Sequence, residues 1–177
     1  MSQDEQALLS QLLEQEQTIQ FEEFGSETAL AIGLRLVDAA RNAGKAIMVD
    51  IRRDEVQLFQ HAMHGTGADN ADWIRRKNNV VRHSQHSSFY AGNYYRSSGT
   101  TFEEYWQLDP RDYAAHGGAF PLLLKGAGVV GTITVSGLPQ ADDHALVVSV
   151  LETFLNMKGA TPTELSSPQL TPGAEIR

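Results

Sequence analysis

The strongest chemical feature of the sequence is a histidine followed by two glycines, His116-Gly117-Gly118. An imidazole titrates near neutral pH, so His116 could act as an acid, a base or a ligand. Glycine accepts positive φ angles and lets backbone N–H groups approach a bound molecule closely. Gly117 and Gly118 could therefore supply donors beside the imidazole. The alternative is a turn that needs glycine for its backbone geometry alone.

A second polar group lies where a strand gives way to the last helix. Ser136-Gly137-Leu138-Pro139 precedes Asp143-His144. An aspartate in the first helical turn complements the helix dipole, whereas a cationic histidine is disfavoured there, which makes His144 unusual. Ser136, His116 and Asp143 could be drawn as a hydrolytic triad. The chain has no GxSxG elbow, so we do not expect hydrolysis.

The third group is Trp73, Arg76 and Lys77, which lie in a segment with a helical pattern. Residues four apart share a helix face, so Lys77 lies on the face of Trp73. A tryptophan on that face is most simply a core or interface anchor, and Lys77 then lies at the edge of buried surface. Two interpretations remain open. Lys77 either extends to water or points into a cleft and meets an anion.

Two other motifs do not support the chemistry they suggest. The GxGxxG string at 126–131 is followed by a β-branched strand rather than a helix, so we interpret it as a hairpin turn and not as a nucleotide site. His61 and His64 have helical metal-ligand spacing, but His61 ends a strand, where i and i+3 face opposite sides. His83 and His86 lie among arginines that disfavour a cation. We expect no metal site.

Composition limits the class of protein. The chain has 177 residues, of which 41% are hydrophobic, and it has no cysteine, which fits one domain without disulfides. The net charge of −8 disfavours generic binding to nucleic acid or anionic membranes. Seven acids and no bases precede Arg35, whereas residues 73–102 contain bases and no acids. The N-terminus lacks the features of a secretory signal, so we expect a cytoplasmic protein.

Periodicity predicts the elements that would position these residues. We expect an antiparallel sheet with helices on one side or at the ends, because two pairs of strands are joined as hairpins. The expected helices cover 4–16, 26–44, 70–84 and 141–156, and the expected strands cover 18–24, 46–51, 56–61, 119–124 and 129–135. Residues 1–157 form the single domain. Residues 158–177, which hold three prolines, form a disordered tail.

Several of these residues together resemble an uncharacterised protein family within the GlcG/HbpS-like (haem-degrading domain) superfamily. The resemblance spans about residues 5–157. It rests on Asp69-Asn70, Trp73-Ile74, Arg76-Lys77, Ser87-Ser88, His116-Gly117-Gly118, Pro121, Gly131, Ser136-Gly137-Leu138-Pro139 and Asp143-His144. It implies an α+β fold that is profilin-like or PAS-like, with a five-stranded antiparallel sheet and flanking helices. It also implies dimers that often assemble further. Some relatives bind haem, but this sequence shows no axial-ligand motif.

The leading hypothesis is a non-catalytic, homo-oligomeric domain that binds a small anionic ligand. Its site would comprise Trp73, Arg76, Lys77, Ser87, Ser88, His116, Gly117, Gly118, Ser136, Asp143 and His144. Haem is a possible cofactor. One alternative is an enzyme on a small anionic metabolite with His116 as acid or base, and another is a protein-assembly adaptor. A leucine-rich N-terminal helix with little to pack against would self-associate, with the acidic N-terminal region meeting the basic 73–102 segment.

Removal of the tail tests whether it contributes to the fold. A chain that ends at Lys158 should keep the melting temperature of the full-length protein within about two degrees, because a disordered segment buries little surface. Differential scanning calorimetry of the two chains measures the difference. A decrease of about 4 °C or more, which corresponds to ~1 kcal/mol or more, would show that the tail docks on the domain.

Overall fold

The computed structural model describes residues 1–159 as an α+β domain, and the tail expected at 158–177 lies almost wholly outside the described residues. The elements are α1 (Gln3–Thr18), α2 (Ser26–Asn42), β1 (Met48–Arg53), β2 (Val56–Ala62), α3 (Ala68–Ser84), α4 (Ser88–Ser97), α5 (Phe102–Trp106), β3 (Ala119–Leu124), β4 (Gly128–Ser136) and α6 (Gln140–Gly159). No helix among these residues is long and apolar enough to cross a bilayer.

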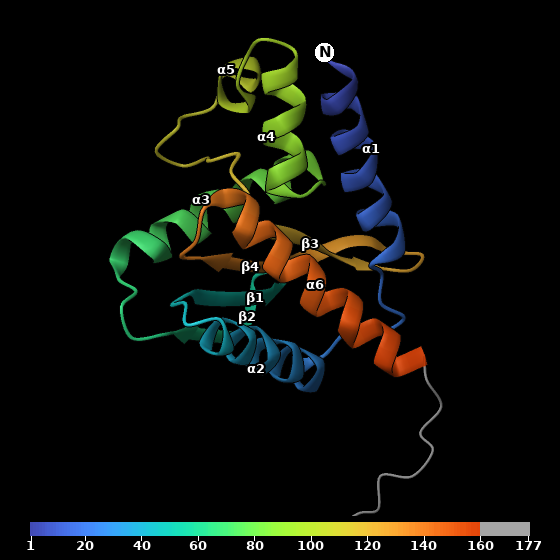
Figure 1. Cartoon of the computed structure of the whole chain (residues 1–177), viewed down its shortest axis with the longest axis vertical. Coiled ribbons are helices and arrows are strands. Elements are labelled where there is room, and N and C mark those ends of the chain that lie inside the picture. The colour runs from blue at the N-terminus through green and yellow to red at the C-terminus, as the bar shows by residue number, and fades with distance from the viewer. Residues whose placement is uncertain (160–177) are drawn as a thin grey trace, which may run out of the picture.

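The sheet is antiparallel, with the strand order β2-β1-β4-β3 (Figure 1). Both predicted hairpins are confirmed, since β1 pairs with β2 and β3 pairs with β4. The glycine-rich turn at 126–128 joins β3 to β4, and Gly126 and Gly128 both have positive φ angles. The GxGxxG string therefore forms a hairpin turn, as its sequence context predicts.

The prediction of a fifth strand over residues 18–24 is wrong. Helix α1 continues to Thr18, and the segment that follows makes only one parallel bridge, between Phe21 and Leu124. Phe21 and Phe24 are both buried, with their rings 4.9 Å apart. Residues three apart on a strand point to opposite faces, so two aromatic rings in one core are incompatible with a regular strand. The segment after α1 is held by burial of its two phenylalanines rather than by pairing with a strand, and the sheet has four strands.

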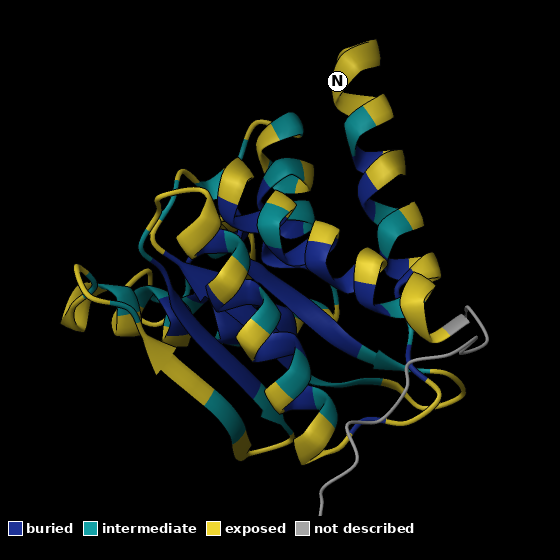
Figure 2. Cartoon of the chain, turned by 60° about the horizontal axis from the view of Figure 1, so that its bottom comes forward, coloured by how far each residue is buried: buried dark blue, intermediate teal, exposed yellow. Residues whose placement is uncertain are grey.

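The two faces of the sheet differ in chemistry, and helices cover both of them rather than one. Val49 and Ile51 of β1 point into an apolar core with α2 and α6, which lie together over that face (Figure 1). Asp50, between them, points to the opposite face, where it meets α3. The central strands are buried on both sides, whereas most of the edge strand β2 is exposed (Figure 2). Helix α3 thus packs on a polar sheet face.

The N-terminal helix is attached within the same chain. Its leucines Leu9 and Leu12 are buried, and α1 packs against α4. Glu16 is also buried: one carboxylate oxygen accepts the Ser87 N–H at 2.8 Å, and the other lies 2.7 Å from His86 Nδ1. The hydrogen bond to Glu16 raises the pKa of His86. An acidic residue of the N-terminal region and the basic segment therefore meet inside one protomer, which removes the expected need for a partner there.

Candidate functional site

A cavity of about 230 Å³ lies between α3, the turn that carries His116 and the corner that joins β4 to α6. This is the region that the sequence predicts to form a pocket. The cavity is lined by Asn70, Trp73, Lys77, His116, Ser136, Gly137, Leu138, Gln140 and Asp143. Five of the expected site residues are thus brought together: Trp73, Lys77, His116, Ser136 and Asp143.

A buried ion pair lies at this cavity. Lys77 Nζ is 3.0 Å from Asp143 Oδ2, and the two side chains are only 4% and 2% exposed. Lys77 also donates to the Val135 carbonyl at 3.3 Å, and Asp143 Oδ1 accepts the Leu138 N–H at 3.0 Å. Burial lowers the pKa of Lys77 and raises the pKa of Asp143, while the opposite charge of the partner opposes both shifts. Both predictions for Lys77, that it extends to water or that it binds an anionic ligand, are wrong, because its ammonium group pairs with the Asp143 carboxylate.

Gly118 makes room for this ion pair, and Gly117 makes room for the start of α6. Gly118 has a φ of 129°, and a Cβ atom there would lie 2.6 Å from Lys77 Nζ. A Cβ atom on Gly117 would lie 2.1 Å from the Gln140 carbonyl oxygen. The Gly117 N–H donates to Gln140 Oε1 at 3.2 Å, so it is already used within the protein. Close packing, rather than donation to a ligand, explains these glycines.

His116 and Trp73 form one side of the cavity, with their rings edge to face and 5.2 Å apart. His116 is exposed, yet partial burial of its ring, followed by the charge of Arg96, lowers its pKa. His116 is therefore largely neutral at neutral pH. The Arg76 guanidinium lies 4.7 Å from the Trp73 ring centroid and donates to the Pro110 carbonyl at 2.7 Å. Arg76 holds Trp73 from outside and does not line the cavity.

The remaining expected residues lie away from the cavity. Ser87 accepts the Tyr90 N–H and begins α4, and Ser88 exchanges two hydrogen bonds with the backbone of Ala119 in β3. Ser88 thus attaches α4 to the sheet, whereas Ser87 caps the helix. His144 is buried beside Phe89 and Phe120 and does not line the cavity, and its Nε2 atom lies 2.9 Å from Gln15 Oε1.

The burial of His144 explains its presence at a helix N-terminus. Desolvation lowers its pKa to about 4, so the ring is neutral at physiological pH and does not oppose the helix dipole. Because Gln15 Oε1 can only accept, the Nε2 atom carries the proton. The Nδ1 atom is buried without a hydrogen-bond partner in the described part of the chain.

Sequence reasoning did not place Asn70 and Gln140 in the site. Asn70 donates to Ser136 Oγ at 3.3 Å and accepts the Gly67 N–H at 3.0 Å. It lies three residues before Trp73 and seven before Lys77, so helical periodicity could have assigned it to the same face. Gln140 begins α6, and its role depends on the close approach of the His116 turn, for which the sequence has no local signal.

Comparison with known proteins places this chain in a class of HbpS-like α+β domains. A family model described as "Haem degrading protein HbpS-like" matches residues 24–152. A UPF0303 protein of Streptomyces avermitilis is 50% identical over 147 residues, which cover 83% of this chain and 90% of that protein. The chain therefore belongs to the HbpS-like family, among its UPF0303 members.

Solved structures share this fold. The crystal structure of the Ybr137w protein has a TM-score of 0.79 and 30% identity, and the match covers 86% of this chain and 90% of that one. A structure of a PduOC:haem complex has a TM-score of 0.57 and 14% identity, with 68% and 87% of the two chains covered. At that identity the likeness shows the fold alone.

The ion pair yields a prediction about stability. Lys77→Met should reduce the free energy of unfolding by about 3–5 kcal/mol, because it leaves the buried Asp143 carboxylate without a partner. Lys77→Met combined with Asp143→Asn should recover most of that loss, since the amide oxygen can still accept the Leu138 N–H. Urea unfolding measures both. Asp142→Asn, at an exposed acid in the same helical turn, is the control. Equal destabilisation by the single and double changes would contradict the pairing.

The depressed pKa of His144 yields a prediction about pH. Between about pH 6.5 and pH 4 the unfolded chain binds a proton at this residue and the folded protein does not. Stability should therefore fall as the pH falls through this window, by at most ~1.4 kcal/mol per pH unit from this residue. His144→Gln should show a shallower dependence in urea unfolding at pH 7, 6 and 5. His64→Gln, at an exposed histidine, should keep the dependence of the unaltered protein.

Proposed function

We propose that the protein is a non-catalytic domain that binds a small polar ligand in the cavity beside Lys77 and Asp143. The observation that carries the proposal is the buried ion pair at this cavity. Burying two charges is costly unless they are paired and hydrogen-bonded, and a site that retains them beside an open space resembles a preorganised polar binding surface. If Lys77 and Asp143 served only to stabilise the fold, apolar side chains at these positions could do the same.

The structure changes the expected chemistry of the ligand. The expectation of an anionic ligand depended on an unpaired Lys77, and the carboxylate of Asp143 neutralises the charge of that lysine. The remaining lining offers an indole, an imidazole, a hydroxyl and two amides, which suit a neutral or zwitterionic molecule with both donors and acceptors. A volume of about 230 Å³ lies below the ~300–1,000 Å³ of drug-sized sites. The ligand is therefore small.

Haem is not supported by this cavity. PduOC has been solved as a complex with haem, and the name of the family refers to haem degradation. A tetrapyrrole is larger than the cavity, and only the exposed His116 offers an imidazole at its opening. Catalysis is also less favoured, because Lys77 is engaged by Asp143 and cannot serve as a free electrostatic stabiliser.

The second candidate function is a role in protein assembly. We include self-association of the chain in this second proposal. Tyr94, Tyr105 and Trp106 are exposed, and aromatic side chains of these types dominate the energetics of protein interfaces. Leu30 and Leu34 are exposed on α2, one helical turn apart. These surfaces support a homo-oligomer or a protein partner without a contribution from the cavity.

The two tryptophans allow a direct test. Trp73 lines the cavity and Trp106 lies on the exposed aromatic surface, so Trp106→Phe leaves an emission that reports on the cavity. Free amino acids and small amides, added one at a time, should include one that changes this emission saturably. Trp73→Phe, in which only Trp106 emits, should not respond to that compound.

Native mass spectrometry of the same preparations completes the test. It reports the number of subunits and any small molecule retained from the host, and we expect a mass above that of one chain. Haemin serves as a further probe, and we expect no saturable Soret shift that His116→Ala abolishes. The ligand proposal fails if no compound is retained and no probe changes the Trp73 emission. A single-chain mass at micromolar concentration would end the proposal of self-association.

A further inference from the structure

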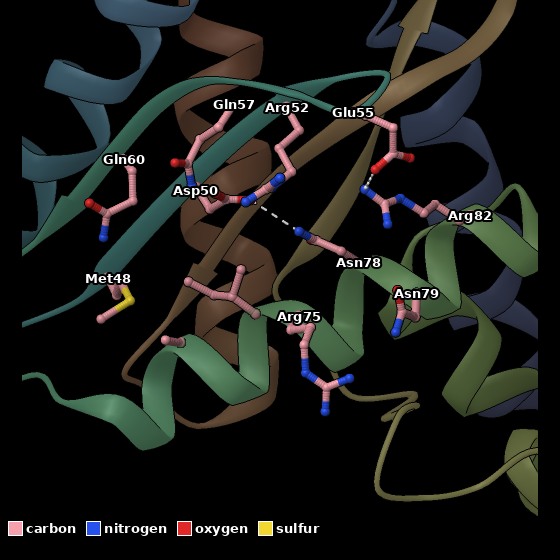
Figure 3. Close-up of a pocket in the computed structure, with 12 residues that line it drawn as sticks. Met48, Asp50, Arg52, Glu55, Gln57, Gln60, Arg75, Asn78, Asn79 and Arg82 are labelled. Atoms are coloured by element: carbon pink, nitrogen blue, oxygen red, sulfur yellow. Dashed lines mark hydrogen bonds and ion pairs between the residues drawn. The ribbon is translucent and has the colours of Figure 1, made fainter.

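A second hollow lies on the other side of α3, between this helix and the exposed part of the sheet. Its volume is about 370 Å³, which falls within the range of small-molecule sites. It is lined by Met48, Asp50, Arg52, Glu55, Gln57, Gln60, Ala71, Ile74, Arg75, Asn78, Asn79 and Arg82. Figure 3 shows that these side chains come from the β1–β2 hairpin on one side and from α3 on the other. None of them belongs to the cavity beside Lys77.

The floor of this groove contains a buried carboxylate. Asp50 accepts hydrogen bonds from Gln57 Nε2 at 2.5 Å, Asn78 Nδ2 at 3.0 Å and Arg52 Nε at 3.1 Å. Asn78 in turn accepts the Thr134 hydroxyl at 2.6 Å. Both oxygens of the carboxylate thus accept hydrogen bonds. These bonds hold the side chains of Gln57, Asn78 and Arg52 in place. Asp50 is buried and is not available to a ligand.

Arg52 is oriented by this carboxylate. Its Nε atom is held by Asp50, while its side chain remains 31% exposed at the groove. A guanidinium donates through a planar fork, so its remaining N–H groups can bind an oxyanion when the Nε side is fixed. A buried carboxylate that holds an arginine in place reduces the entropy that the arginine would lose on binding.

A second arginine approaches the same end of the groove from α3. The only ion pair of Arg82 in the described residues is with Glu55, at 3.6 Å, and Glu55 is 86% exposed (Figure 3). Such an exposed pair contributes little and is easily exchanged for a ligand. Asp50 and Glu55 formally balance the charges of Arg52 and Arg82. In the described part of the chain, however, Arg52 donates only through Nε, and the Arg82 guanidinium makes no hydrogen bond within 3.5 Å. An oxyanion that accepts these unused N–H groups and displaces the exposed Glu55 is therefore favoured there.

The opposite end of the groove is lined mainly by apolar side chains, with Gln60 beside them. Met48 and Ile74 are largely buried and, with Ala71, line that end of the surface. Met48 lies with Gln60 at the far side from Arg82 in Figure 3. The groove therefore has a charged end and an apolar end within one small volume.

We propose that this groove is a second binding site, for a small amphipathic acid. The oxyanion of the ligand, a carboxylate or a phosphate, would lie between Arg52 and Arg82, and a short aliphatic body would lie over Met48, Ala71 and Ile74. The two arginines supply the charge-assisted hydrogen bonds, and the apolar end supplies buried surface. The site does not depend on the cavity beside Lys77.

Methionine NMR can detect this binding at its own location. The chain has four methionines, and Met48 alone lines the groove, so its ¹³C ε-methyl signal is the reporter. Hexanoate is the probe, with hexanol as its uncharged analogue, acetate as the head group alone and hexyl phosphate as the alternative oxyanion. We expect a saturable shift of the Met48 signal with hexanoate or hexyl phosphate, and a weaker or absent shift with hexanol and acetate. The emission of Trp73 should not change.

Substitution of the arginines then identifies the head-group site. Arg82→Gln, at a partly exposed side chain, should keep the fold and weaken hexanoate binding about tenfold, the factor that corresponds to loss of one good charge-assisted contact. Arg52→Gln should weaken it at least as much, with the melting temperature measured to confirm folding. Arg41→Gln removes an equal charge on α2, on the other face of the sheet, and should have no effect.

The proposal is overturned by any of three results. These are no shift of Met48 with either amphipathic acid, an equal response to hexanol, or unchanged affinity in Arg82→Gln. Trp73 reports on the other cavity, so none of these results bears on the proposed function. In the same way, an unchanged Trp73 emission would not contradict the proposal for the groove.

Discussion

The ion pair between Lys77 and Asp143 determines how the parts of this domain meet. Lys77 belongs to α3 and Asp143 to the first turn of α6, and the lysine also reaches the backbone of β4. A helix on one face of the sheet is thus joined to the start of a helix that covers the other face. The contact favours glycine at 118, since φ there is 129° and a Cβ atom would lie 2.5 Å from the Val135 carbonyl oxygen and 2.6 Å from the ammonium nitrogen. Breaking such a pair on one side leaves an uncompensated charge, so both partners constrain the chain together.

The next residue of α3 repeats this anchoring. Asn78 bonds Thr134 and Asp50, while Lys77 bonds the carbonyl of the adjacent Val135. Two consecutive helix residues therefore meet two consecutive residues of β4 through polar atoms. Their side chains diverge toward different sides of α3, one to the cavity at the β4–α6 corner and one to the groove over β1 and β2. A polar sheet face, hydrogen-bonded to α3 at Asp50 and Thr134, both fixes the helix and lines the two hollows beside it.

The HbpS-like family supplies the scaffold but not the ligand. The four-stranded sheet and its flanking helices match structures that share little sequence with this chain, including one described as a haem complex. A fold of this kind can hold different ligands, because the site depends on particular side chains rather than on the architecture. In this chain the polar lining and small volume of the cavity suit a small molecule. The exposed aromatic residues and the groove are further surfaces of the same scaffold.

Local patterns in the sequence predicted helices α1, α2, α3 and α6 and both hairpins, whereas α4 and α5 were not among the expected helices. They succeed because hydrophobic periodicity, glycine turns and capping act over a few residues. The same reasoning assigned a strand to 18–24, and it failed because Phe21 and Phe24 enter one core, a consequence of packing rather than of local preference. The helices on both faces of the sheet were missed for a similar reason.

Tertiary structure alone decided the partners of the buried ionisable groups. Lys77 meets a carboxylate 66 residues away, Glu16 meets His86 across 70 residues, and His144 meets Gln15 across 129. Each residue could be singled out in the sequence, but its charge state and role depend on what lies opposite it in the fold. Burial and pairing set the electrostatic free energy of an ionisable group, and both are properties of the packed chain. The sequence by itself therefore determined which side chains could do chemistry here, and the fold decided which of them remain available to do it.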